Sequence, residues 1–343
     1  MILTLRVLVG LGQGATFPVA LNIITSWAST QEIGIVIALS SGGQYLGAIL
    51  ANSVSGILAA SNFLGGWPSL FYVFAGLGVV WSILWFIFVR DSPQDSKCMS
   101  ESEKHFLRVH SLPKTDVKIS EIPWKSILSC GPVWSTIIFH GCNCYSYFML
   151  LSDLPKFIVE VLHFNIKDSG FIGSVPYIMT WLGFIISGRI SDVVISKGML
   201  SKVVTRKVVG IFSMFIPGVL LFFSTFFNDK LPILVFMNLA MFFQGFVNSC
   251  MYVNYTDLSP RFAAILCGLG NTLCALLGIV GPVIVGFLIN GIQLEDTTKL
   301  KHRWQIAFAS ASLIWALGSI QFCVFGSATV QSWNKEKRDD NEI

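Results

Sequence analysis

Long apolar stretches alternate with short charged segments along the whole chain of 343 residues. Nine such stretches can be traced, and each is long enough as a helix to cross a hydrocarbon layer of about 30 Å. Inside a bilayer every backbone N–H and C=O group needs an internal partner, which a helix supplies. The stretches begin near Ile2, Ile35, Trp67, Val133, Gly170, Val208, Leu231, Phe262 and Ile306. The pattern predicts an all-α membrane protein that crosses the bilayer many times.

Composition and charge agree with this interpretation. Hydrophobic residues make up 53% of the chain and charged residues 12%, and the mean hydropathy is +0.68. These values exclude most soluble enzymes and favour transport. The net charge of +4 is not a nucleic-acid signal, because 16 of the 23 Lys and Arg residues fall in gaps that alternate spans place on one side of the membrane. Basic residues gather on the cytoplasmic side, so we expect the C-terminus inside and Met1 outside.

A weak internal repeat relates the first three stretches to the last three. Gln13-Gly14 recurs as Gln244-Gly245, and Trp67-x-x-x-Phe71 recurs as Trp304-x-x-x-Phe308, at separations of 231 and 237 residues. Two six-helix halves related by a parallel repeat are the layout of major facilitator transporters. We therefore expect nine of twelve transmembrane helices, helices 4–12, with three further helices before Met1.

The gap of residues 91–131 divides the chain, because it combines mixed charge with three prolines. Ser100 followed by Glu103 matches a capping box, which favours a short cytoplasmic helix there; a solvated linker without a stable helix is the alternative. The expected organisation is a remnant of the N-terminal bundle (1–90), a cytoplasmic central loop (91–131), a C-terminal six-helix bundle (132–330) and a cytoplasmic tail (331–343).

Four segments carry a more specific signature. They are Gly66-Trp67-x-x-x-Phe71-Tyr72-Val73-Phe74 with Asp91-Ser92-Pro93 beyond, Ile122-Pro123-Trp124-Lys125-Ser126, Asn254-x-x-Asp257-Leu258-Ser259-Pro260-Arg261 with Gly268-x-x-Asn271, and Arg6-x-x-x-Gly10-x-x-x-Gly14. They resemble the anion transporters of solute carrier family 17, which include the sodium/phosphate cotransporters, sialin and the vesicular glutamate transporters. The resemblance implies secondary transport of inorganic phosphate or a small organic anion by alternating access, and no enzymatic activity.

Arg6 is the leading candidate for substrate binding. A guanidinium inside an apolar stretch marks a functional site by default, and it can grip a carboxylate or phosphate with two hydrogen bonds. The resemblance likewise assigns Arg6 to anion binding in the central cavity. The alternative is that Arg6 only extends its side chain to the membrane surface.

Gln13 lies seven residues after Arg6, on the same helix face. The vesicular members of the resembled family carry a glutamate at this position, implicated in proton coupling. A glutamine cannot release a proton, so Gln13 favours sodium as the coupling ion. The alternative is that Gln13 only makes a hydrogen bond between helices, as its repeat partner Gln244 could.

Polar residues in later stretches complete the expected binding site. Asn143 stands where the vesicular glutamate transporters have an arginine, and this departure favours a smaller or less charged anion. Tyr145 and Tyr147 point about 200° apart, so they cannot both face one cavity. Asn271 belongs to the resembled turn, and His140 is interpreted as a packed histidine. The predicted substrate-binding residues are Arg6, Gln13, Asn143, Tyr145 and Asn271.

The segment 188–192 resembles the cytoplasmic gating motif of major facilitators, in which the acid pairs with basic residues. Asp192 would then pair with basic residues such as Arg206, and Glu32 fits the matching loop of the first half. Anchoring by basic residues at the cytoplasmic surface is the alternative. The predicted gating residues are Glu32, Arg189, Asp192, Asp257 and Arg261.

No metal site and no cofactor are expected beyond the coupling ion. The five histidines are scattered, Cys142-x-Cys144 lacks further ligands at useful spacing, and no Walker-type glycine loop appears. Cysteines within the stretches are interpreted as small apolar groups.

We expect a small anionic substrate and the lipid bilayer as partners, and no nucleic acid. The expected location is the plasma membrane or an endolysosomal or vesicular membrane. Two functional alternatives remain: a truncated isoform or gene-model fragment without transport, which would at most interact with a full-length transporter, and a proton-coupled transporter of organic anions in vesicles or lysosomes.

Overall fold

A computed structural model of the chain describes residues 2–14, 16–28, 33–90, 92–96, 99–110, 122–290 and 297–334. The described residues form helices and connecting segments and contain no β-strand, which confirms the all-α prediction. The chain divides into two compact units, of which the first is Met1–Gln44 with Leu58–Lys118 and the second is Tyr45–Ile57 with Ile119–Ile343. The division falls inside the predicted loop 91–131, and the remaining domain bounds stay predictions.

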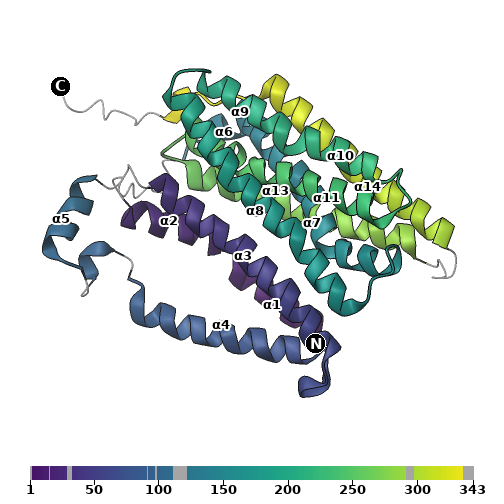
Figure 1. The fold of residues 1–343 in the computed structure, drawn as a ribbon. Helices are drawn as coiled ribbons and strands as arrows, with labels where there is room; N and C mark the ends of the chain where they lie inside the picture. The colour runs from purple at the N-terminus through teal and green to yellow at the C-terminus, as the bar shows by residue number, and fades with distance from the viewer. Residues whose placement is uncertain are drawn as a thin grey trace, which may run out of the picture. The chain divides into compact units, whose positions relative to one another are not determined.

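The first unit consists of helices joined by short turns (Figure 1). Its elements are α1 (Ile2–Gly14), α2 (Thr16–Trp27), part of α3 (Ile33–Ala60), the 3-10 turn η1 (Phe63–Gly65), α4 (Ser69–Phe88), the 3-10 turn η2 (Pro93–Asp95) and α5 (Glu101–His110). The stretch predicted to begin near Ile2 is thus described as two helices, α1 and α2. The short helix predicted in the central gap is confirmed as α5, because the Glu103 backbone N–H donates to Ser100 Oγ at 3.3 Å.

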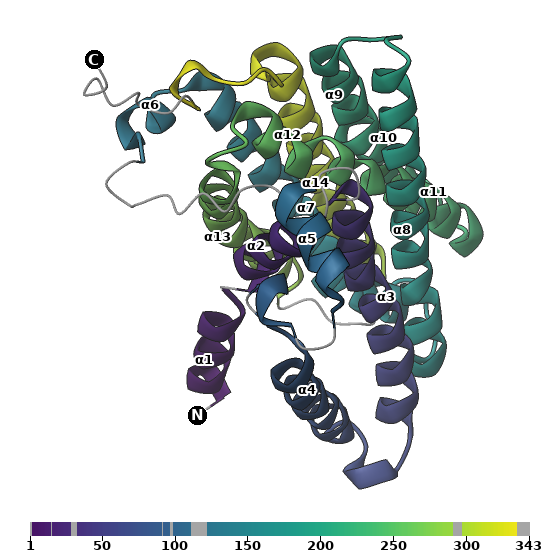
Figure 2. The same cartoon turned by 90° about the vertical axis from the view of Figure 1, so that its left-hand side faces the viewer.

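The second unit is a bundle of long helices (Figure 1). Its elements are α6 (Trp124–Leu128), α7 (Gly131–Glu160), α8 (Ile166–Ser196), α9 (Lys202–Gly210), the π-helical turn η4 (Ile211–Phe215), α10 (Ile216–Ser224), α11 (Lys230–Gln244), the 3-10 turn η5 (Gly245–Ser249), α12 (Met251–Leu258), α13 (Ala263–Ile289), α14 (Thr297–Phe325) and the 3-10 turn η6 (Ser332–Asn334). Residues 45–57 of α3 belong to this unit, where Asn248 donates to the Tyr45 hydroxyl at 2.7 Å. Figure 2 shows α8 beside α9, which continues through η4 into α10 as one span.

Six helical segments in the described part of the chain are long and apolar enough to cross a membrane. They are Ser69–Phe88, Gly170–Ser196, Lys202–Ser224, Lys230–Leu258, Ala263–Ile289 and Thr298–Phe325. By length, α3 and α7 also suffice, since their 28 and 30 residues extend for about 40–45 Å. These segments account for eight of the nine predicted stretches.

The core of the second unit is aromatic and aliphatic. Trp304, Trp315 and Phe139 have at most 1% of their surface exposed, and the Phe157 ring lies 5.3 Å from that of Trp304. The most extensive helix pairing joins α7 to α13. Burial of these rings orients the polar face of α7 toward its neighbours within the unit.

Two glycines allow backbones to touch where α8 meets the α11–η5 junction. A Cβ at Gly245 would overlap the carbonyl of Thr180, and one at Gly183 would overlap the carbonyl of Phe242. Close approach at small residues is the usual way membrane helices gain packing contacts. This junction places Ser249 beside α8 (Ser187 and Ser249 hydroxyls 2.7 Å apart) and so builds one wall of the polar network described next.

Candidate functional site

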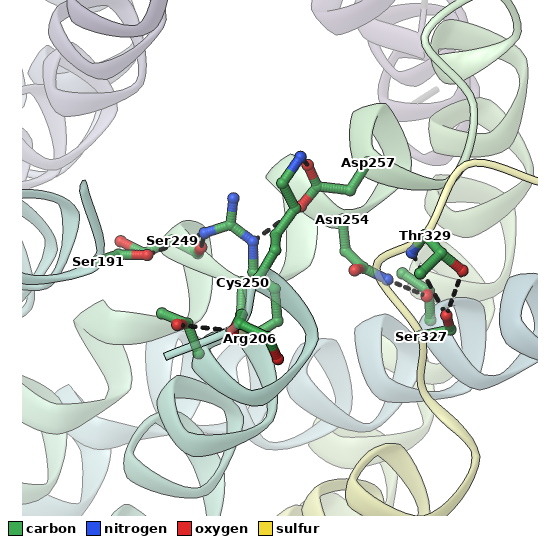
Figure 3. A network of polar contacts seen from close by, with 12 residues as sticks. Ser191, Arg206, Ser249, Cys250, Asn254, Asp257, Ser327 and Thr329 are labelled. Carbon is green, nitrogen blue, oxygen red and sulfur yellow. Dashed lines mark hydrogen bonds and ion pairs between the residues drawn. The ribbon is translucent and has the colours of Figure 1, made fainter. Parts of the chain in front are cut away.

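Arg206 lies at the centre of a buried polar network at one end of the second unit (Figure 3). Only 7% of its surface is exposed. Its Nε donates to Asp257 Oδ2 at 2.9 Å, and its Nη1 donates to Ser191 Oγ at 2.9 Å and to the Ser249 carbonyl at 2.8 Å. One guanidinium from α9 therefore connects α8, η5 and α12.

Lys202 adds a second cation to the same carboxylate. Its Nζ lies 3.2 Å from Asp257 Oδ1, and its side chain is 50% exposed, against 9% for Asp257. Lys202 and Arg206 are four residues apart, so α9 presents both from one face. The helix starts at the right place because Ser201 caps it, accepting a bond from the Val204 N–H at 3.4 Å.

The bonds of this network favour a structural role, in which Arg206 holds α9 to its neighbouring helices, over a role in substrate binding. A buried ion pair is tolerated when further hydrogen bonds support it, and here Ser191 and Ser249 accept from Nη1 of Arg206. The Nε of Arg206 is already directed to Asp257. Separation of α9 from α12 would leave charges unpaired in an apolar bundle, so the network ties these helices together.

The predicted gating residues are not gathered in one place. Asp257 is in the network, whereas Arg189 and Asp192 are exposed on α8. Among the described residues Asp192 makes no ion pair, and the acid that pairs with Arg206 is Asp257. The expected ion pair between Asp192 and a basic residue is therefore not formed in this conformation among the described residues. Arg261 lies after α12 with its guanidinium over the Phe262 ring, and Glu32 lies outside the described residues.

A second polar group lies inside the bundle along α7. His140 is fully buried, and its Nδ1 lies 3.1 Å from the Tyr255 hydroxyl of α12. One turn earlier, Thr136 Oγ1 accepts from Asn254 Nδ2 at 2.7 Å. The interpretation of His140 as a packed histidine agrees with this burial. Both contacts join α7 to α12, the helix that also carries Asp257.

Predicted substrate-binding residues of the second unit are engaged in helix contacts. Asn143 is buried, and its Oδ1 accepts from Gln244 Nε2 at 3.2 Å. The Tyr145 hydroxyl lies 3.1 Å from Ser310 Oγ of α14, and Asn271 Nδ2 points to Cys267 Sγ at 3.9 Å on its own helix. Gln244 thus makes a hydrogen bond between helices, which is the alternative role considered for Gln13, its partner in the internal repeat. The binding role of these residues stays a prediction.

Arg6 and Gln13 lie on α1 in the first unit, and both are exposed. Within the described residues Arg6 makes no ion pair, unlike Arg206. The two side chains share a face of α1, as their spacing requires. That they face one cavity with Asn143 stays a prediction.

One expectation about the cysteines is wrong. Cys144 of α7 and Cys274 of α13 form a disulfide, so these two do not act as separate small apolar groups. Sequence spacing could not reveal this pair, because 130 residues separate them. The Arg206–Asp257 pair was missed for a similar reason. Each residue has a sequence signal of its own, Asp257 in the resembled turn and Arg206 among the expected basic partners, but nothing in the sequence pairs the two.

The sequence of this chain is similar to a family of membrane proteins and to individual members of it. The family model described as Major Facilitator Superfamily matches residues 1–282. Human sialin is 32% identical over 97% of this chain and 65% of its own length. A Drosophila melanogaster protein named "Putative inorganic phosphate cotransporter" is 31% identical over 98% of this chain and 63% of its own length. The chain therefore spans less than two thirds of these relatives.

The fold has a counterpart among solved structures. A bacterial homolog of the human lysosomal transporter Spinster, crystallised in an inward-facing and unoccupied conformation, has a TM-score of 0.59 to this chain. The superposition covers 90% of this chain and 75% of that one, at 15% sequence identity. At this level of identity the likeness concerns the fold, and it confirms the predicted architecture.

Proposed function

Because this chain belongs to the Major Facilitator Superfamily and, within it, to solute carrier family 17, we propose that it moves inorganic phosphate or a small organic anion across a membrane by secondary transport. The observation that carries the proposal is the alignment of nearly the whole chain with sialin and with the Drosophila relative. The family consists of membrane-embedded transporters, not enzymes. The chain is accordingly a multi-pass integral membrane protein.

Arg6 is the proposed anion ligand. It is exposed on an apolar helix and unpaired among the described residues, whereas the donors of Arg206 are directed to Asp257 and protein oxygens. A planar guanidinium presents two parallel N–H donors, which match two oxygens of a phosphate or carboxylate. Gln13 on the same face would add a neutral donor and acceptor.

Sodium is the proposed coupling ion. Gln13 carries no titratable proton, so the α1 face offers no carboxylate to couple uptake to a proton gradient. The resemblance of the sequence to the sodium/phosphate cotransporters points the same way. Proton coupling is the competing proposal.

The Arg206 network is proposed to keep α8, α9 and α12 moving as one piece during alternating access. Transporters of this architecture rock one bundle against the other around a central site. Rigid bundles require that their internal polar contacts survive the motion. Asp257, with Arg206 and Lys202, would supply such contacts at the predicted cytoplasmic end.

Uptake into proteoliposomes tests the proposal. The chain would be reconstituted, and entry of radiolabelled phosphate and of a sialic acid would be followed with and without an inward sodium gradient. We expect uptake of at least one anion that requires sodium and persists with a protonophore. Empty liposomes and an Asp229→Asn variant, altered at an exposed carboxylate outside the predicted binding and gating residues, serve as controls.

Two results would count against the proposed sodium-coupled transport of an anion. Uptake that ignores sodium and collapses with a protonophore would establish proton coupling instead. Absence of uptake for both anions under either gradient, from protein that elutes as a single species, would favour the form without transport.

A further inference from the structure

Three possible metal ligands meet inside the second unit, away from the Arg206 network. They are His140, Cys144 and Cys274, whose ligand atoms all lie within 4.8 Å of one another. His140 and Cys144 are buried, and Cys274 is partly buried. The neutral imidazole and thiolate groups they can offer are the preferred ligands of Zn²⁺.

Helix geometry explains why the three meet. His140 and Cys144 are four residues apart on α7, so they lie on the same face one turn apart. That face packs on α13, the most extensive helix contact in the bundle, and there Cys144 is bonded to Cys274. The group is therefore held by two helices rather than by a loop.

The imidazole of His140 has one ring nitrogen that is not used in a hydrogen bond among the described residues. Its Nδ1 lies 3.1 Å from the Tyr255 hydroxyl, while its Nε2 is buried and has no hydrogen-bond partner among the described residues. Buried polar atoms without a partner are uncommon and destabilising. Metal-bound histidines typically use one nitrogen for the metal and donate the other N–H to a nearby oxygen, here that of Tyr255.

Gly270 makes this orientation sterically accessible. It lies four residues before Cys274, and a Cβ there would overlap the Tyr255 hydroxyl and come within 3.0 Å of His140 Nδ1. The Tyr255–His140 pair therefore occupies the space that a side chain at residue 270 would fill. The pair is packed against the same turn of α13 that leads to Cys274.

We propose that Cys144, Cys274 and His140 form a zinc-class metal site that becomes available when the Cys144–Cys274 disulfide is reduced. In the oxidised form the two sulfurs are bonded to each other, and no thiolate is offered. A dithiol reductant exchanges with the disulfide, is itself oxidised to a cyclic disulfide, and leaves two cysteine thiols. Binding of Zn²⁺ then releases two thiol protons and forms two Zn–S bonds and one Zn–N bond.

The two forms would hold the same helices in different ways. The disulfide joins α7 to α13 covalently, and the metal would join them through coordination with water in the fourth tetrahedral position. The sulfurs must separate when the metal enters, since Zn–S bonds are about 2.3 Å long and tetrahedral ligands stand apart. Reduction without metal would leave α7 and α13 joined by packing alone.

Metal binding to the purified chain tests the proposal. Protein in detergent would be reduced with dithiothreitol, desalted without oxygen, and incubated with Zn²⁺; bound zinc would be measured by atomic absorption after a second desalting. Co²⁺ would replace Zn²⁺ in a parallel sample, because sulfur-to-cobalt charge-transfer absorption reports thiolate ligation. We expect roughly one tightly bound ion per reduced chain, and none in the oxidised chain.

Matched variants identify the ligands. Cys144→Ser and Cys274→Ser should each abolish the sulfur-to-cobalt charge-transfer band expected for two thiolate ligands. His140→Gln should weaken zinc binding by at least about tenfold. Cys142→Ser and Cys267→Ser change free cysteines on the same two helices and should leave binding intact. Labelling with a maleimide polymer checks folding and oxidation state, because two additional thiols should react only after reduction.

Several outcomes would overturn the proposal. They are equal zinc content in oxidised and reduced protein, loss of binding in the Cys142→Ser control, and no ion bound to reduced wild-type protein. A Cys274→Ser protein that keeps both its zinc and its cobalt band would do the same. None of these readouts depends on transport.

Discussion

Two arginines in this chain have opposite surroundings. Arg206 is 7% exposed and donates to Asp257, Ser191 and Ser249. Arg6 is exposed on α1 and forms no ion pair in the described part of the chain. Both border or interrupt apolar sequence, so hydropathy alone does not separate them. The difference is that, among the described residues, Arg206 has a carboxylate partner and Arg6 has none.

If Arg6 is the anion ligand proposed above, this contrast is one between a structural charge and a charge that a substrate meets. A buried guanidinium with a carboxylate and two further acceptors is internally neutralised, and its removal should affect folding. An intramembrane guanidinium without a protein partner is costly unless a ligand, water or lipid headgroup meets it. Substitutions in the Arg206 network should therefore lower the unfolding free energy, whereas substitutions of Arg6 should lower anion uptake.

The largest effect is expected from Asp257→Ala. It leaves Arg206 buried without its carboxylate, which for such pairs costs about 3–5 kcal/mol of unfolding free energy. Unfolding of the purified protein in mixed micelles, titrated with SDS, measures the loss. Asp192→Ala, at an exposed carboxylate on the neighbouring helix α8, is the control and should change little. Equal stability of the two variants would mean that Arg206 does not depend on Asp257.

The second-largest effect is expected for anion uptake by the Arg6→Lys variant. Lysine keeps the charge but loses the two-pronged contact, so anion uptake should fall about tenfold or more, as expected for loss of one hydrogen bond to a charged group. Stability in the same SDS titration should stay near that of the wild type. Arg206→Lys should do the reverse, lowering stability through the lost bonds to Ser191 and Ser249. Near-normal uptake by Arg6→Lys would show that Arg6 only anchors the helix at the surface.

The smallest effect is expected from Lys202→Ala. Its ammonium lies 3.2 Å from Asp257, yet the side chain is 50% exposed. Ion pairs with such exposure contribute about 0.2–1 kcal/mol and weaken in salt. The SDS titration at low and high ionic strength checks this. A loss as large as that of Asp257→Ala would mean that Lys202, and not Arg206, is the main partner.

Local and periodic features of this structure could be predicted from the sequence. The apolar stretches predicted the bundle, and Ser100 with Glu103 predicted the start of α5. Gln244, identified through the repeat, makes the interhelical bond anticipated as an alternative for Gln13. The first two successes share a cause, because helix periodicity and capping depend on residues that are close in the chain, whereas the Gln244 bond reaches Asn143, 101 residues away.

Pairings between helices could not be predicted in the same way. Asp257 is 51 residues from Arg206, and the resembled motif predicts Asp192 as the acid of the pair instead. Asp192 was expected to pair because it lies in a resembled motif, but α8 exposes it. The Cys144–Cys274 bond depends on the register between α7 and α13, which one sequence does not determine.

The π-helical turn at Ile211–Phe215 has a consequence for insertions and deletions. Pro217 follows it, and a proline ring clashes with the carbonyl four residues earlier, which the wider turn accommodates. A π turn is in effect one extra residue in an α-helix, and each residue turns an α-helix by about 100°. Deleting one residue from the regular turns of α9 after Arg206 would therefore rotate Arg206 by about that angle and point it away from Asp257. Deleting one residue within the π turn would instead convert it to an α-helical turn, keep the helix faces nearly in place, and bring the Pro217 ring against the carbonyl four residues earlier.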